Sequence, residues 1–138
     1  MIQRISLRVF VAATEDEKRV REALAFFVPL ESILITSAKG HFGNEIKILE
    51  ATLKNKECLA FFHILKEQLP SEERLKLRRE APERTDEKSC FHLRLDKQAA
   101  YKGYVKLTDT KDAIDISVHI ALFPARREEA VRIIGELI

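Results

Sequence analysis

The sequence contains little cysteine, glycine or proline and no tryptophan: two cysteines, four glycines and four prolines occur among its 138 residues. Cys58 and Cys90 can form at most one disulfide, and the four histidines are too scattered to make a zinc-binding motif. Both cysteines stand among apolar or strand-like residues, so we expect two free thiols in the core, with a disulfide as the alternative. We expect no metal ion and no other cofactor.

Long apolar runs are also missing. No stretch is long enough to span a bilayer, and residues 1–4 lead into an alternating strand without a signal peptide. We therefore expect a cytoplasmic protein that makes no membrane contact. The net charge is only +2, so any affinity for a nucleic acid must come from local clusters of cations and not from the charge of the whole chain.

The residues that are present favour one compact domain over residues 1–138, because 46% of them are hydrophobic and no linker or repeat divides the chain. Hydrophobic periodicity predicts strands at 4–11, 33–35, 46–53, 91–95, 104–107 and 113–123, and helices after a capping box at 14–17, at 57–69, at 70–82 and from 124 onward. This order predicts an α+β fold, in which helices pack on one face of a mostly antiparallel sheet and leave the other face open.

The segment from Arg94 to Tyr101 is the most informative part of the sequence. Alternation through Leu95 predicts a strand, and Asp96 stands where the N-cap of a short helix is expected. The segment would bring two cations, an amide and an aromatic ring to one edge of the sheet, namely Arg94, Lys97, Gln98 and Tyr101. This combination suits a ligand with phosphates and bases better than it suits catalysis. The alternative is an ordinary strand-to-helix corner with solvated charges.

A second informative stretch is the loop that runs from Gly40 to Asn44. Its two glycines allow positive backbone dihedrals or close approach of a ligand, and His41, Phe42 and Asn44 offer a ring nitrogen, a stacking surface and an amide. The glycine spacing matches neither a Walker phosphate loop nor a dinucleotide-binding loop. The alternative is a connecting loop whose Phe42 packs in the core.

With residues 14–17 and with 123–128 near the end, these two stretches resemble the archaeal RNA-binding family described as predicted exosome subunits. The resemblance covers nearly the whole chain. It implies a single α/β domain similar in fold to a ribosomal protein of the large subunit, and a role in binding RNA. It carries over no catalytic residue.

The open face of the predicted sheet alternates cations with aromatic and hydroxyl side chains. It holds Arg4, Ser6, Arg8, Phe10, His92, Arg94, Tyr104, Lys106, Ser117 and His119, with Asp115 as the one acid. RNA recognition modules use such sheets, because rings stack on bases while cations contact phosphates. A solvated polar face is the alternative.

Two cations, Arg126 and Arg127, stand at the start of the last helix, where the helix dipole disfavours positive charge. An RNA phosphate or Glu129 would compensate them. By contrast, the cations of residues 74–84 alternate with acids at helical spacing, so we expect a self-compensated surface helix there.

We expect no enzymatic activity. His41, His92 and His119 are candidate acid–base groups, but their positions in the sequence bring no two of them together. Cys90 and His92 would lie about 7 Å apart on one strand face, which is too far for a nucleophile–base pair. A histidine-dependent ribonuclease is the enzymatic alternative.

The sequence therefore predicts a non-catalytic RNA-binding protein, an accessory factor in RNA processing or degradation. The alternative is an adaptor that binds other subunits of an RNA-processing complex without touching RNA. The expected partners are RNA and subunits of the exosome or another RNA-processing complex, and the oligomeric state stays open. The residues expected to contact RNA are Arg4, Arg8, His41, Phe42, Asn44, His92, Arg94, Lys97, Gln98, Tyr101, Lys106, Arg126 and Arg127.

Overall fold

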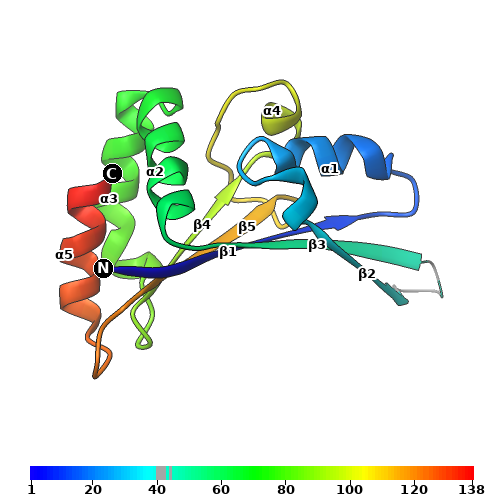
Figure 1. Cartoon of the computed structure of the whole chain (residues 1–138). Helices are drawn as coiled ribbons and strands as arrows, with labels where there is room; N and C mark the ends of the chain where they lie inside the picture. The colour runs from blue at the N-terminus through cyan, green and yellow to red at the C-terminus, as the bar shows by residue number, and fades with distance from the viewer. Residues whose placement is uncertain (40–42, 44) are drawn as a thin grey trace. The chain divides into compact units, whose positions relative to one another are not determined.

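The computed structural model describes residues 1–39, 43 and 45–138. Within them the chain forms a five-stranded antiparallel sheet and five α-helices, which confirms the predicted α+β fold (Figure 1). The strands are β1 (Ile2–Val11), β2 (Leu34–Lys39), β3 (Glu45–Leu53), β4 (Cys90–Leu95) and β5 (Ile114–Ile120), in the order β2-β3-β1-β5-β4. The helices are α1 (Glu17–Ala25), α2 (Lys56–Gln68), α3 (Ser71–Arg84), α4 (Lys97–Tyr101) and α5 (Arg127–Leu137).

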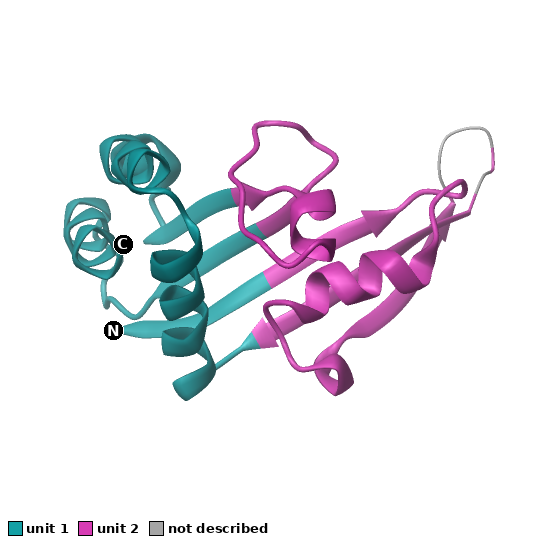
Figure 2. Cartoon of the chain, turned by 90° about the horizontal axis from the view of Figure 1, so that it is seen from above, with its two compact units in different colours: residues 1–6, 53–93, 116–138 teal, residues 7–52, 94–115 magenta. Residues whose placement is uncertain are grey.

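The chain forms two compact units, which Figure 2 distinguishes by colour. Unit 1 contains residues 1–6, 53–93 and 116–138, and unit 2 contains residues 7–52 and 94–115. Strands β1, β3, β4 and β5 each contribute residues to both units. The expectation of a single domain over residues 1–138 stays a prediction. No helix in the described part of the chain is long and apolar enough to cross a membrane.

Unit 2 has a core of strand residues and two helices. Val9 from β1, Leu24 from α1 and Ala99 from α4 are fully buried, and α1 packs against α4. The N-cap of α1 is Asp16, whose side chain accepts a hydrogen bond from the amide of Lys18 at 3.0 Å. The prediction that Thr14 caps this helix is therefore wrong, because the carboxylate nearest to the first helical amides belongs to Asp16.

The first turn of α1 is also fixed by an ion pair with β3. Glu17 lies 2.7 Å from the ammonium of Lys47 and 3.2 Å from the guanidinium of Arg21. The hydrogen bond from Lys47 holds the pKa of the Glu17 carboxyl below its ordinary value, although burial opposes this shift.

This lowered pKa predicts a dependence of stability on pH. A carboxyl with a lower pKa in the folded chain stabilises the fold above its unfolded pKa, near about 4.3, and loses that contribution as the pH falls through the folded value. We expect wild type to be more stable than Glu17→Gln at neutral pH, and the difference to shrink in acid as the carboxyl becomes protonated. Urea unfolding at neutral and at acid pH measures it. Glu22→Gln, an exposed neighbour on α1, is the control, and an unchanged difference at acid pH would contradict the assignment.

Unit 1 has three helices, α2, α3 and α5. The buried side of α2 consists of Cys58, Phe61, Phe62 and Leu65. Leu59 is 63% exposed, so α2 is buried on one side only. α3 packs against α5, and the Arg78 guanidinium donates to the carbonyl of Ile138 at 3.1 Å.

Helix α3 continues through Pro82 to Arg84, so the prediction that Ala81 and Pro82 end it is wrong. Proline removes one amide donor from this last turn. The turn is held instead by the Thr85 hydroxyl, which donates to Ala81 O at 2.7 Å, and by an ion pair between Arg84 and Glu80 at 2.8 Å. A helix end is predicted from the positions of residues such as proline, and this pattern does not include side-chain contacts of this kind.

Three further predictions differ from the structure. Residues 104–107 form no strand, and only Leu107 pairs with Leu95 in a single antiparallel bridge. The last helix does not begin at Pro124, because it starts at Arg127 with Arg126 as its N-cap. β2 is longer than expected, and its register with β3 runs without interruption from Leu34↔Glu50 to Lys39↔Glu45, so this pairing contains no bulge.

Candidate nucleic-acid interface

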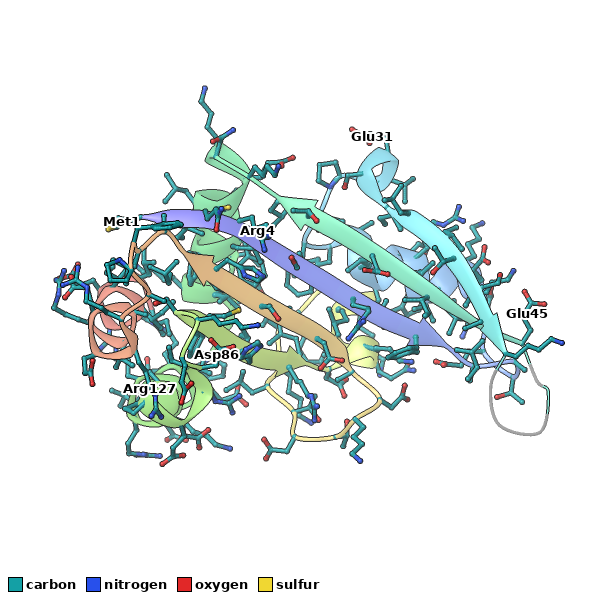
Figure 3. All side chains as sticks on the ribbon, turned by 90° about the horizontal axis from the view of Figure 1, so that it is seen from below. Met1, Arg4, Glu31, Glu45, Asp86 and Arg127 are labelled. Atoms are coloured by element: carbon teal, nitrogen blue, oxygen red, sulfur yellow. The ribbon has the colours of Figure 1, made fainter. Side chains whose placement is uncertain are left out.

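One face of the sheet is free of helices in each unit. Along β1, Ile5, Leu7, Val9 and Val11 are buried, whereas the residues between them are half-buried or exposed. The same alternation holds along β5 and through the second half of β4. Figure 3 looks onto the side without helices and shows the Arg4 side chain on β1. The polar residues of both units on this side, which sequence periodicity predicted, are therefore accessible.

In unit 2 this face carries a cation beside an aromatic ring. Arg8 is exposed, and its guanidinium carbon lies 5.8 Å from the centroid of the Phe10 ring, which is 38% exposed. A cation over an aromatic face at this separation is a weakly favourable contact. Because β1 places both side chains on one side, a base that stacks on Phe10 would bring its phosphate toward Arg8.

Arg94 lies on the same side of unit 2, but an acid already binds it. Its Nε donates to the Asp115 carboxylate at 2.8 Å, and the two side chains are 41% and 31% exposed. Such a half-exposed pair contributes little to stability. The carboxylate of Asp115, the single acid expected on this face, does weaken the attraction of Arg94 for a phosphate.

Lys97 does not lie on this surface. Its side chain is 4% exposed, and its ammonium contacts the carbonyl of Phe10 at 3.1 Å, Glu15 at 2.9 Å and Asp112 at 2.6 Å. Lys97 was expected to be exposed to solvent, but it is buried and its ammonium has three acceptors. The residues near Lys97 in the sequence do not predict this burial, because its acceptor Glu15 lies 82 residues away.

Gln98 and Tyr101 line a hollow of about 280 Å³ in unit 2, with residues of α1 and the turn before it. The guanidinium carbon of Arg19 lies 5.6 Å from the Tyr101 ring centroid, and its Nε lies 3.8 Å from the Asp16 carboxylate. The predicted corner 94–101 therefore forms as a strand and a helix capped by Asp96, which accepts from Ala99 N at 2.8 Å. Of its four candidate side chains, Lys97, Gln98 and Tyr101 line this hollow, whereas Arg94 is paired with Asp115.

In unit 1 the face carries a hydrogen-bonded polar cluster. His92 contacts the Ser117 hydroxyl through Nδ1 at 3.1 Å and the Asp86 carboxylate through Nε2 at 2.8 Å. Burial lowers the pKa of His119, and the charge of Arg4 adds to this shift. Burial opposes but does not outweigh the hydrogen bonds from His92 and two backbone amides that lower the pKa of Asp86.

The comparisons with known proteins agree on one family. A family model described as RNA binding matches residues 4–120. The chain belongs to this RNA-binding family. An RNA-binding protein of Pyrococcus abyssi is 34% identical over 96% of this chain and 90% of its own length.

Solved structures of the same family have the same fold. A protein of Archaeoglobus fulgidus superposes with a TM-score of 0.87 at 34% identity, and all of both chains is covered. A protein of Methanothermobacter thermautotrophicus gives a TM-score of 0.84 at 33% identity over 99% of this chain and 98% of its own. The resemblance to an archaeal RNA-binding family is therefore confirmed, while a connection to the exosome is not established by these relatives.

Three further candidates from the sequence lie outside the five strands. Lys106 is exposed between buried Val105 and half-buried Leu107. Arg126 is exposed, and its positive charge helps to lower the pKa of Glu129, after the hydrogen bond from Arg132. Arg127 donates to the carbonyl of Pro82 at 3.1 Å, so this backbone oxygen at the end of α3 is its acceptor.

The loop candidates His41, Phe42 and Asn44 lie outside the described residues. Asp86, Ser117 and His119 form a polar cluster with His92. Of these four residues, only His92 was expected to contact RNA. Alternation along β4 and β5 predicts that His92, Ser117 and His119 lie on the same face of the sheet. Only the pairing of the two strands shows that their side chains are in contact.

Proposed function

We propose that this member of the RNA-binding family binds single-stranded RNA through the helix-free face of unit 2. The observation that carries the proposal is the pair Arg8 and Phe10. Arg8 is an exposed cation for which no ion pair is found among residues 1–39, 43 and 45–138, and it lies beside a partly exposed ring. Bases have aromatic faces and phosphates are anions, so one nucleotide can satisfy both side chains.

Residues after α4 add groups of the same kind. Lys106 is exposed, and the buried or half-buried residues on both sides of it place its side chain away from the core of unit 2. The antiparallel bridge between Leu95 and Leu107 turns these two leucines inward, and Arg94 and Lys106 then share the outer side. Three cations of unit 2 thus face the side that no helix covers, and Asp115 offsets one of them.

The proposal predicts a modest dependence of affinity on salt. Each phosphate contact contributes about −0.7 to the slope of log K against log salt for a single strand. We expect Arg8→Gln to reduce the magnitude of this slope by about one contact and to weaken binding of a short oligonucleotide. Fluorescence anisotropy at several salt concentrations measures both quantities.

The matched control is Arg79→Gln, which removes one exposed cation from α3. It should leave the slope within error of wild type. An equal change in both variants would mean that RNA responds to net charge alone, and no change in Arg8→Gln would exclude this arginine from the interface.

We propose in addition that the protein is not an enzyme and acts as an accessory factor in RNA processing or degradation. His92 lies between Ser117 and Asp86, but Nδ1 faces the hydroxyl and Nε2 the carboxylate, the reverse of serine hydrolases. Incubation with labelled RNA should leave the strand intact. Co-purification with exosome subunits, the role that the family resemblance suggests, would support the accessory function.

One observation favours a second candidate, a protein adaptor. Every residue of the edge strand β2 is exposed, including Leu34 at 69% and Ile35 at 41%. An uncovered edge strand with apolar side chains can pair with a strand of another protein. An adaptor would bind no RNA in isolation, and substitution of Ile35 by lysine would abolish its co-purification with processing factors.

A further inference from the structure

Three side chains with metal-binding atoms converge in unit 1, and a fourth lies beside one of them. The ligand atoms of Asp86, Cys90 and His92 all lie within 4.8 Å of one another, so the expected separation of about 7 Å between Cys90 and His92 is too large for their side-chain atoms. His119 adds a fourth, because its Nε2 lies 3.9 Å from the Cys90 sulfur. A thiol, two imidazoles and a carboxylate are the donor types that bind zinc and its neighbours among the transition metals.

The turn before β4 holds two of these donors in place. Thr85 pairs with Phe91 in an antiparallel bridge, and the amide of Asp86 donates to Cys90 O at 2.9 Å. One oxygen of the Asp86 carboxylate accepts from the amides of Lys88 at 2.9 Å and Cys90 at 3.1 Å. The other oxygen is therefore directed toward His92, where it can bind a cation.

A second contact orients the imidazole. Nδ1 of His92 lies 3.1 Å from the Ser117 hydroxyl, so this nitrogen can donate its proton there and leave the lone pair on Nε2. Histidines that bind metals almost always donate their other ring N–H to a protein acceptor. Ser117 comes from β5, like His119, and so both strands contribute to the same cluster.

From this geometry we propose that Asp86, Cys90, His92 and His119 form a tetrahedral binding site for Zn²⁺. Bond lengths of about 2.0 Å to nitrogen and oxygen and about 2.3 Å to sulfur put tetrahedral ligands roughly 3.3–3.6 Å apart. The observed 2.8 Å between Asp86 and His92 and 3.9 Å between Cys90 and His119 lie on either side of this range. Small rotations of exposed His92 and half-buried His119 would bring both distances toward it.

The charges of the site balance. One thiolate and one carboxylate neutralise the two charges of Zn²⁺, and both imidazoles bind as neutral rings. Binding replaces the hydrogen bond between His92 and Asp86 by two metal bonds, and the proton of the Cys90 thiol leaves to solvent. Arg4 opposes the cation, since its charge acts on both Cys90 and His119. The arrangement uses four protein ligands, as in structural zinc sites.

Cobalt substitution tests the site, since Co²⁺ takes zinc geometry and reports thiolate binding by colour. The reduced full-length protein is titrated with Co²⁺ and then with Zn²⁺. We expect one equivalent to give the visible bands of tetrahedral cobalt and a sulfur charge-transfer band, both lost on addition of Zn²⁺. Zn²⁺ should also raise the melting temperature of wild type.

The variants separate this site from adventitious binding. Cys90→Ser should abolish the charge-transfer band, and Ser117→Ala should weaken Co²⁺ binding by about 10- to 100-fold. His63→Gln and Cys58→Ser, which change a histidine and a thiol outside the cluster, should behave as wild type. Because Cys90 is buried, His92→Gln at the half-exposed ligand serves as the second test if Cys90→Ser fails to fold. A wild-type protein that stays colourless with Co²⁺, or a band that persists in His92→Gln, overturns the proposal, and neither result bears on RNA binding.

Discussion

Replacement of Lys97 by methionine is expected to lower the free energy of unfolding by about 2–3 kcal/mol. The substitution keeps the length of the side chain but removes an ammonium that is 4% exposed and bonds three oxygens of unit 2. Removal of one partner of a buried ion pair costs about 3–5 kcal/mol, because the other charge is left uncompensated. Since Glu15 and Asp112 retain 24% and 74% exposure, solvent relieves part of this cost.

Urea unfolding monitored by circular dichroism measures the effect. Lys66→Met, on the exposed side of α2, is the matched control and should change stability by less than about 0.5 kcal/mol. The double variant Lys97→Met with Glu15→Gln should recover part of the loss, as expected for groups in contact. A Lys97→Met protein as stable as the control would contradict the structural role of this ammonium.

Replacement of Phe10 by alanine is expected to weaken RNA binding by about 1–3 kcal/mol, or roughly 5- to 150-fold, the range measured when a base loses its aromatic stacking partner. The ring is 38% exposed on the helix-free side of unit 2 and lies beside Arg8. Because this term is not electrostatic, the slope of log K against log salt should stay as in wild type.

Anisotropy with a short single-stranded oligonucleotide measures the loss. Phe10→Tyr keeps a stacking surface and should bind nearly as wild type, whereas Leu75→Ala removes an exposed apolar side chain from α3 and should have no effect. Affinity in Phe10→Ala equal to that of Phe10→Tyr would show that no base stacks on this ring, and the interface proposed for unit 2 would have to be abandoned.

The sequence predicted the elements whose signals are local. Strand β1 follows the alternation of Ile5, Leu7 and Val9, and α4 follows a capping aspartate, Asp96. A period of two and an N-cap depend on residues within a few positions of one another. The open face also follows from local alternation, because the side chains on one side of each strand are buried and those on the opposite side are accessible.

Features fixed by distant residues could not be predicted in this way. The burial of Lys97 depends on Glu15 from the turn before α1 and on Asp112 from the turn before β5. The cluster around His92 depends on β4 pairing with β5, which places Ser117 and His119 beside it. Patterns in a single sequence give neither the order of the strands nor their register, so convergent groups of this kind emerge only from the fold.

If RNA binds unit 2 as proposed, the contact between Arg94 and Asp115 should shorten the time that a strand stays bound there. A phosphate reaches the guanidinium only by displacing the carboxylate from Nε or by sharing the group with it. When a phosphate departs, the carboxylate is already at hand to take its place, so release needs no unpaired charge to form. On the proposed interface, such an internal competitor would favour fast exchange of the bound strand.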